Sequence, residues 1–263
     1  MRGSWSVLVA AACGLVAPIA SCGGDAGSAA TSNSATAPTT GRSAEGIDVL
    51  YLTDSSGWRV AQEYVRVAED ELGVPVRLID WRIPGLSMVE ALARIEERPQ
   101  VVAEAEVIVL WANPLHSGVK DEANACMSGT GAPPQITSVG DWKPFADLFG
   151  EALDAIWRAR ADAPTAIRVT DLYSPAFEQW KQAGVYEACR TAWTTMSDAI
   201  AAVAATHGAT MVSAWDVYNG TQHDEDPVDK GWIASDGVHP SDAGAQAMAA
   251  ALAAVGFEPS PAP

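Results

Sequence analysis

The segment IDVLYLT at residues 47–53 decides how the rest of the sequence is interpreted. It is a short apolar run with β-branched residues, which is typical of a strand buried on both faces of a parallel sheet. The next segment, residues 58–72, repeats apolar residues at helical spacing, and Gly73 ends it. A buried strand followed at once by a helix is the repeating unit of α/β folds.

The same alternation continues to the end of the chain. The expected strands are residues 47–53, 76–81, 106–111, 165–172 and 209–215. The expected helices are residues 58–72, 87–98, 141–161, 186–207 and 241–255. This order predicts a three-layer α/β fold, a parallel sheet with helices on both faces. Five strands favour the flavodoxin-like order 2-1-3-4-5, in which ligands bind beyond the carboxyl ends of the strands.

Length and composition fit one domain with a sizeable core. The chain has 263 residues, of which 48% are hydrophobic. We place the domain at residues 47–257 and a disordered tail at residues 258–263. The formal net charge of −17 repels phosphate backbones, so the composition argues against nucleic acid as a partner. We expect the domain to be a monomer.

Residues 1–21 have the pattern of a secretory signal peptide. A positively charged start precedes an apolar stretch from Val7 to Ala20, which is too short to span a bilayer comfortably. The sequence Ile-Ala-Ser-Cys at residues 19–22 resembles the lipobox of bacterial lipoproteins. That resemblance implies that Cys22 is acylated and becomes the new N-terminus. The alternative is a plain secretory signal with an incidental cysteine.

The residues after Cys22 have the composition of a tether. Residues 23–46 are rich in Gly, Ser, Thr and Ala and show no apolar period, so they cannot bury enough surface to order themselves. Two or more acyl chains on one residue give a stable membrane anchor. We therefore expect the segment 22–46 to hold the domain at the cell membrane, on the extracytoplasmic side of a bacterial envelope.

Two of the four cysteines remain once the signal and the lipid site are accounted for. Cys13 leaves with the signal peptide, and Cys22 takes the lipid. Cys126 and Cys189 are left in a compartment that permits disulfides. We predict a bridge between them; the alternative is two buried free thiols.

Polar and glycine residues follow the ends of the expected strands. Ser55 comes after the first strand, Gly85 after the second and Asn113 after the third. Asp236 and His239 precede the last helix. Because the carboxyl ends of parallel strands meet at one edge of a sheet, we expect these residues to lie together.

These residue types are the ones that acyl transfer through a serine requires. A serine hydroxyl needs a base within hydrogen-bond reach, and imidazole titrates near neutral pH. A carboxylate fixes the imidazole tautomer, and Asp236 precedes His239 by three residues. Candidate donors for the developing oxyanion are the backbone amides of Ser55 and Gly85 and the side-chain amide of Asn113. Taken singly, each residue also has a plain reading as a helix cap, turn or surface residue.

The blocks around these residues resemble those of the SGNH hydrolase family over residues 47–256. The closest block is SDGVHPSDAG at residues 235–244, and AWDVYNG at residues 214–220 is also similar to the family. The resemblance implies Ser55 as nucleophile, Gly85 and Asn113 as oxyanion donors, and Asp236 and His239 as acid and base. It also implies hydrolysis of carboxylic esters, often on lipids or sugars, without a metal or other cofactor.

Three residues depart from the family pattern and leave alternatives open. Thr53 stands where the family has glycine, and Trp111 and Pro114 depart from its third block. A binding lipoprotein that keeps the fold without activity is therefore one alternative. An O-acyltransferase, in which a sugar hydroxyl replaces water, is the other, because the same triad serves both reactions.

Other chemically active residues lack a site pattern. The acidic run of residues 224–226 is better read as a solvated loop than as a calcium site. The remaining histidines, His116, His207 and His223, lack the spacing of zinc ligands, so no metal is expected. Four tryptophans near the site blocks are candidates either for a wall of the substrate cleft or for core packing: Trp58, Trp81, Trp111 and Trp232.

Overall fold

The computed structural model describes residues 46–111, 113–114, 126, 134–161 and 163–259. The predicted signal peptide, Cys22 and all of the tether except Gly46 lie outside the described residues, as do His116 and residues 260–263. From residue 46 onward, the described chain falls within one compact unit, Arg42–Pro263.

A five-stranded parallel sheet forms the centre of this unit. Its strands are β1 (Ile47–Thr53), β2 (Val76–Arg82), β3 (Val107–Trp111), β4 (Ala166–Thr170) and β5 (Thr210–Val212). Their order is β2-β1-β3-β4-β5, and every neighbouring pair is parallel, which confirms the predicted topology. In the register of the sheet Thr53 pairs with both Arg82 and Trp111, so β1, β2 and β3 end at the same level.

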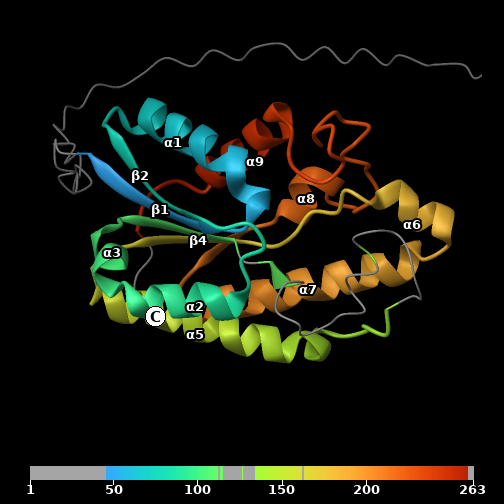
Figure 1. Cartoon of the computed structure of the whole chain (residues 1–263), viewed down its shortest axis with the longest axis horizontal. Helices are drawn as coiled ribbons and strands as arrows, with labels where there is room; N and C mark the ends of the chain where they lie inside the picture. Colours follow the sequence, from blue (N-terminus) through green and yellow to red (C-terminus); the bar gives the residue numbers. More distant parts are fainter. Residues whose placement is uncertain (1–45, 112, 115–125, 127–133, 162, 260–263) are drawn as a thin grey trace, which may run out of the picture. The chain divides into compact units, whose positions relative to one another are not determined.

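Helices cover both faces of the sheet (Figure 1). The helices are α1 (Trp58–Leu72), α2 (Met88–Glu97), α3 (Pro99–Glu104), α5 (Lys143–Arg160), α6 (Phe177–Ala183), α7 (Tyr186–Thr206), α8 (Ala214–Asn219) and α9 (Asp242–Ala254). Helix α1 packs against α9 on one face, and α5 packs against α2 and α7 on the other. Within the described ranges, no helix combines the length and apolar character needed to cross a membrane.

The predicted strands 165–172 and 209–215 were too long. β4 ends at Thr170 and β5 at Val212, because the residues after each strand leave the sheet. Ser213 stops β5: its side chain accepts a hydrogen bond from the Asp216 amide and caps α8. Helix α6 was not predicted, since its seven residues are too few to show a clear period.

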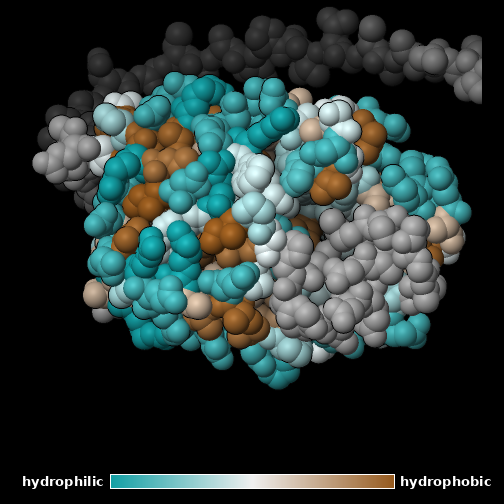
Figure 2. Space-filling model, viewed as in Figure 1, coloured by the Kyte–Doolittle hydropathy of each residue, from teal (hydrophilic) through white to brown (hydrophobic). Residues whose placement is uncertain are grey.

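The surface in view carries no single large apolar face. Figure 2 shows hydrophobic residues as separate patches among hydrophilic ones. The large hydrophobic side chains that are exposed are likewise dispersed along the described chain: Trp58, Val89, Val139, Val228, Val238 and Val255. Isolated exposed residues of this kind are ordinary. One of them, Trp58, lies beside the candidate site.

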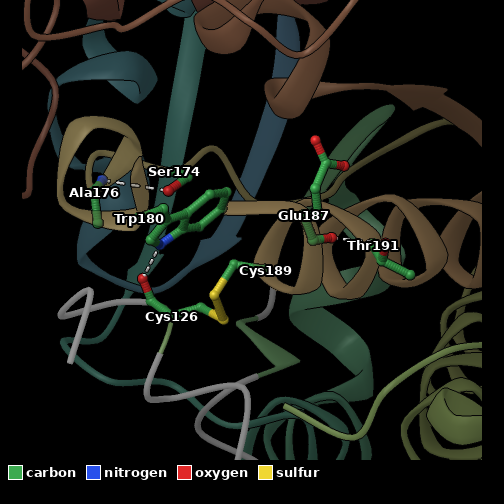
Figure 3. The surroundings of a disulfide bond; sticks show 7 residues. All are labelled: Cys126, Ser174, Ala176, Trp180, Glu187, Cys189 and Thr191. Atoms are coloured by element: carbon green, nitrogen blue, oxygen red, sulfur yellow. Dashed lines mark hydrogen bonds between the residues drawn. A yellow bond between two sulfur atoms is a disulfide. The ribbon is translucent and has the colours of Figure 1, made fainter. Parts of the chain in front are cut away.

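The predicted disulfide between Cys126 and Cys189 is present, with 5.6 Å between the two Cα atoms (Figure 3). Cys189 belongs to α7, and the Trp180 indole of α6 donates a hydrogen bond to the Cys126 carbonyl. The bridge therefore ties Cys126 to α7. Closing a loop with a sequence separation of 63 stabilises the fold by about 4 kcal/mol in the chain-entropy model.

Candidate active site

Ser55 lies at the turn between β1 and α1. The strand ends at Thr53, and a short 3-10 helix, Ser55–Gly57, leads into α1. The buried side chain of Asp54 caps this turn by accepting the Ser56 amide at 2.9 Å. The cap holds Ser55 at the carboxyl edge of the sheet.

Ser55, His239 and Asp236 form a continuous hydrogen-bonded line. His239 Nε2 is 2.9 Å from Ser55 Oγ, although the two residues are 184 positions apart in sequence. His239 Nδ1 is 2.9 Å from Asp236 Oδ2. The three residues singled out from the sequence are thus brought together in the order in which the sequence predicts a nucleophile, a base and an acid.

The charge of Asp236 fixes the tautomer of this line. Its Oδ1 accepts the backbone amides of His239 and Val238, each at 2.9 Å. These bonds, with the His239 ring, lower the pKa of Asp236 to about 2. A carboxylate that is ionised at neutral pH can only accept, so Nδ1 carries the hydrogen. Nε2 of neutral His239 is then left to accept the proton of Ser55.

The loop that carries His239 is held from several directions. The Tyr173 hydroxyl donates to the Val238 carbonyl at 2.7 Å, and Arg59 Nη1 donates to the Pro240 carbonyl at 3.2 Å. Gly237 adopts a φ of +75°, a conformation that favours glycine and allows the tight turn from Asp236 to His239. The imidazole therefore sits on a braced loop rather than on a free one.

Trp58 flanks the imidazole. Its ring lies 6.2 Å from the His239 ring, centroid to centroid, with an angle of only 8° between the planes. As the first residue of α1 it remains 47% exposed, and Arg82 donates a hydrogen bond to its carbonyl. A pocket of about 190 Å³, which we call the Ser55 pocket, is lined by Ser55, Trp58, Arg59, Ala234, Asp236, His239 and Pro240.

The two other predicted oxyanion donors lie at the same edge of the sheet. Asn113 is buried, and its Nδ2 donates to Asp54 Oδ2 at 2.9 Å, which fixes the amide beside the Ser55 turn. Gly85 lies in the turn after β2, and the Ile83 amide of that turn donates to the Thr53 carbonyl at 2.9 Å. Gly85 has a φ of +71° and open space where a Cβ would stand, so backbone conformation rather than crowding favours glycine there.

The departures from the family pattern at Thr53, Trp111 and Pro114 are accommodated by packing. Thr53 is fully buried, and a Cβ added to Gly57 would stand 2.5 Å from its Cγ2, so a glycine at the start of α1 makes room for the threonine. Trp111 is buried and meets the Tyr173 ring edge-on at 6.4 Å. Pro114 is buried as well. None of the three interrupts the line from Ser55 to Asp236.

Of the four tryptophans considered, only Trp58 lines the Ser55 pocket. Trp81 and Trp111 are buried, and Trp232 is partly buried and packs against the core. Core packing is therefore the correct reading for these three residues.

Three residues that brace the site were not among those predicted from the sequence: Tyr173, Arg59 and Arg82. Tyr173 follows β4 by three residues, so the rule that selected residues beyond strand ends would have found it had it been applied to the fourth strand. Arg59 and Arg82 contact backbone carbonyls, and no sequence spacing signals such contacts.

No group of three or more His, Cys, Asp or Glu residues in the described part of the chain is arranged to hold a metal ion. In the acidic loop, Glu225 pairs with Lys230, and Asp226 Oδ1 accepts the Val228 amide at 2.8 Å. These two carboxylates therefore stabilise the conformation of the loop in which they lie.

Comparison with known proteins finds solved structures with a similar fold. No protein-family model and no curated protein matches the sequence. Among solved structures, the chain is similar to the lipase Lip_vut3 from a goat rumen metagenome, with a TM-score of 0.62 and 19% identity over 81% of this chain and 98% of that chain. The chain therefore shares the α/β fold of this lipase.

Two further structures are more distant. The psychrotrophic esterase EstA from Pseudoalteromonas sp. has a TM-score of 0.48 and 13% identity over 78% of this chain and 93% of that one. The lipase/acylhydrolase from Enterococcus faecalis has a TM-score of 0.49 and 15% identity over 80% of this chain and 95% of that one. At these identities a likeness speaks to the fold alone, so function has to be argued from the site.

Proposed function

We propose that this chain is a serine hydrolase of the SGNH type that cleaves carboxylic esters through an acyl-enzyme. The observation that carries the proposal is the line from Ser55 Oγ through His239 to Asp236, with both hydrogen bonds at 2.9 Å. The line opens into the Ser55 pocket, where a substrate carbonyl can reach the hydroxyl.

The geometry supports a two-step reaction. Ser55 Oγ attacks the ester carbonyl while His239 Nε2 takes its proton, and ionised Asp236 stabilises the resulting imidazolium. His239 then returns the proton to the alcohol oxygen as the ester bond breaks. A water molecule, activated by the same imidazole, releases the acid and restores Ser55.

The negative charge on the tetrahedral intermediate requires donors fixed beforehand. We assign this role to the backbone amides of Ser55 and Gly85 and to the side-chain amide of Asn113. The hydrogen bond from Asn113 to Asp54 supports the assignment, because it holds the amide plane beside the nucleophile before substrate binds.

The experiment that tests this function uses a panel of p-nitrophenyl esters from acetate to palmitate. Ser55→Ala is expected to lower turnover by at least about 10³-fold while leaving the circular dichroism spectrum unchanged. Wild-type turnover in the variant would remove Ser55 as the nucleophile. Failure of the wild-type chain to cleave any ester would favour a binding lipoprotein instead.

The same triad could pass the acyl group to a sugar hydroxyl rather than to water. Product analysis with and without a sugar acceptor separates an O-acyltransferase from a hydrolase. Release of free acid at the same rate in both conditions supports the hydrolase.

We further propose that the enzyme is exported and held at the membrane by a lipid on Cys22. The lipobox-like residues 19–22 and the composition of residues 23–46 support this location, and the disulfide fits an oxidising compartment. Cys22→Ser should shift the protein from the membrane fraction to the soluble fraction or block its processing. Mass spectrometry that finds an unlipidated mature N-terminus on the wild-type protein would contradict the anchor.

A further inference from the structure

A second hollow borders the Ser55 pocket. It has a volume of about 370 Å³ and is lined by Trp58, Arg59, Asp80 and Arg82; we call it the Asp80 hollow. Trp58 and Arg59 line both cavities, so the two are neighbours across these side chains. A substrate bound at Ser55 that passes these two side chains would enter the Asp80 hollow.

Arg82 is the fixed part of this hollow. Its guanidinium donates to both carboxylate oxygens of Asp80, to Gln62 and to the Trp58 carbonyl. The side chain is only 12% exposed. Because its donors are already used within the protein, Arg82 holds the hollow in shape and has little left to offer a ligand.

Asp80 and Arg59 are the parts that face solvent. The side chain of Asp80 is 43% exposed and that of Arg59 is 52% exposed. Hydrogen bonding to Arg82 lowers the pKa of Asp80, so it remains a carboxylate acceptor at neutral pH. Arg59 supplies donors, with its Nη1 already near the Pro240 carbonyl and Asp242.

Trp58 supplies a flat apolar surface at the junction. The residues of α1 that are buried in the core are Val60, Ala61, Tyr64 and Ala68. Trp58 is not among them, and its ring runs parallel to the imidazole of His239. A planar ring beside the reacting atoms, flanked by one acceptor and one donor, selects for the shape and polarity of what binds there.

We propose that the Asp80 hollow binds the sugar ring of a carbohydrate ester, with the C–H face of the sugar on Trp58 and its hydroxyl groups on Asp80 and Arg59. The inference rests on the proposed ester hydrolysis and specifies its substrate class. The sugar is the alcohol part of the ester, and a small acyl group occupies the Ser55 pocket.

The charged side chains of the Asp80 hollow disfavour an alkyl chain and an anionic group as ligands. An alkyl chain would strip water from Arg59 and Asp80 without replacing their hydrogen bonds, which is costly. An anionic group would meet the Asp80 carboxylate, while Arg82 is already neutralised by it. A neutral polyol both donates and accepts hydrogen bonds and presents an apolar ring face, so it matches all of the exposed groups.

The reaction balances with water as the only co-reactant. Ser55 Oγ first bonds to the acyl carbon, and the bond from that carbon to the sugar oxygen breaks when the tetrahedral intermediate collapses. The Ser55 proton passes through His239 to the sugar oxygen, and water then releases the acid.

The test compares two esters on the full-length protein and its variants. One is p-nitrophenyl acetate, and the other is methyl 6-O-acetyl-glucoside, which carries the same acyl group on a sugar. The readout is the ratio of kcat/KM for the sugar ester to kcat/KM for p-nitrophenyl acetate. A ratio cancels any damage that a variant does to the shared chemistry.

Trp58→Leu and Trp58→Phe form the first matched pair. Leucine keeps an apolar side chain but removes the ring, so the ratio should fall at least tenfold, mainly through a higher KM for the sugar ester. Phenylalanine keeps a stacking face, so its ratio should stay within about threefold of wild type. An unchanged ratio in Trp58→Leu overturns the proposal. A higher activity of Trp58→Leu than of wild type on p-nitrophenyl octanoate also overturns it, because it would show that the hollow binds an alkyl chain.

Arg59→Gln and Arg66→Gln form the second pair, both on α1. Arg66 pairs with Glu63 and Asp70, away from the Asp80 hollow, and its variant should keep the wild-type ratio. Arg59→Gln should lower the ratio about fivefold. Equal ratios in the two variants count against a sugar contact at Arg59.

A binding measurement separates this inference from the proposed function. Methyl glucoside has no ester, so its binding to the Ser55→Ala variant can be followed by saturation-transfer NMR. Binding that disappears in the Ser55→Ala, Trp58→Leu double variant supports the sugar site, even if no ester is hydrolysed. Absence of binding, together with normal hydrolysis of p-nitrophenyl acetate by the wild-type protein, overturns the sugar site and leaves the esterase in place.

Discussion

Two aspartates near the carboxyl edge of the sheet, Asp236 and Asp171, are held in different surroundings: an exposed loop and a buried position beside the start of α8. Asp236 lies on the exposed loop, where hydrogen bonds lower its pKa to about 2. Asp171 directly follows β4 and is fully buried, and desolvation raises its pKa to about 6 despite its hydrogen bonds. Both carboxylates accept backbone amides, so burial decides the direction of the shift.

The difference separates a chemical role from a structural one. Asp171 accepts hydrogen bonds from Ser197 at 2.6 Å, from Ser213 at 2.9 Å and from the Trp215 amide at 3.0 Å. It thereby joins α7 to the start of α8. The hydrogen bonds of the Asp236 carboxylate, by contrast, are to two backbone amides of its own loop and to the His239 ring. One carboxylate fixes the fold, and the other stays charged for the imidazole.

The largest expected effect comes from Asp236→Asn, which keeps the shape of the side chain and removes its charge. We expect kcat on p-nitrophenyl acetate to fall by about 10⁴-fold, because an amide favours the wrong imidazole tautomer. The free energy of unfolding should fall only modestly at pH 7, because the asparagine oxygen can still accept the two backbone amides and solvent screens the lost charge. The control is Asp171→Asn, whose kcat at pH 7 should stay within a few-fold of wild type. Equal losses in both variants would erase the distinction between the two aspartates.

Asn113→Ala should have the next largest effect, because it removes a donor at the nucleophile rather than the acid–base line. A lost oxyanion donor costs about 10²–10³ in kcat, with a smaller change in KM. Asn113→Asp should be at least as damaging, since it replaces the donor with a negative charge. Values of kcat within threefold of wild type for both variants would exclude Asn113 from the oxyanion hole.

The pH dependence of stability should distinguish Asp171 from Asp236 most clearly. A carboxyl group with a raised pKa binds its proton more tightly in the folded state, so its ionisation weakens folding as pH rises from about 4 through 6. The difference between a pKa of about 6 and the ordinary 3.8 corresponds to about 3 kcal/mol. Asp236 has the opposite sign, because its lowered pKa gives stability above pH 4 that is lost as pH falls toward 2.

Denaturant unfolding of wild type and Asp171→Asn at pH 4 and pH 7 measures the first of these effects. The asparagine amide can donate to the two serine hydroxyls, so the variant should fold and should gain stability relative to wild type on going from pH 4 to pH 7. A constant difference between the two proteins at both pH values would mean that Asp171 does not titrate in this range.

The hydrogen-bonded line from Ser55 to Asp236 could be predicted from the sequence because its signals are local. Asp236 and His239 are three residues apart in one block, and Ser55 follows an unmistakable buried strand. The parallel sheet followed from the alternation of strands and helices, and the strand order from the flavodoxin-like arrangement that five such strands favour. What remained hidden depends on contacts between distant segments. Arg82 donates to the Trp58 carbonyl and Arg59 to the Pro240 carbonyl, and no spacing in the sequence records those partners.

The predictions that were wrong have a similar cause. The predicted strand 209–215 reads as an apolar run, but a cap at Ser213 and a buried carboxylate at Asp171 turn its last residues into α8. Likewise, four tryptophans looked equivalent until packing placed Trp81 and Trp111 in the core and left Trp58 beside His239. The sequence shows that a tryptophan is present near a site block, whereas only the packing shows whether its ring lies in the core or beside the site.

The most direct test of the central claim is covalent labelling with a fluorophosphonate ester, followed by peptide mass spectrometry. An activated serine displaces fluoride and keeps the phosphonate, so a hydrolase with this triad should carry one adduct, on Ser55. Labelling should disappear in Ser55→Ala and become much slower in Asp236→Asn. An adduct on a different residue, or an unlabelled Ser55 in a preparation that hydrolyses esters, would contradict the assignment of the active site.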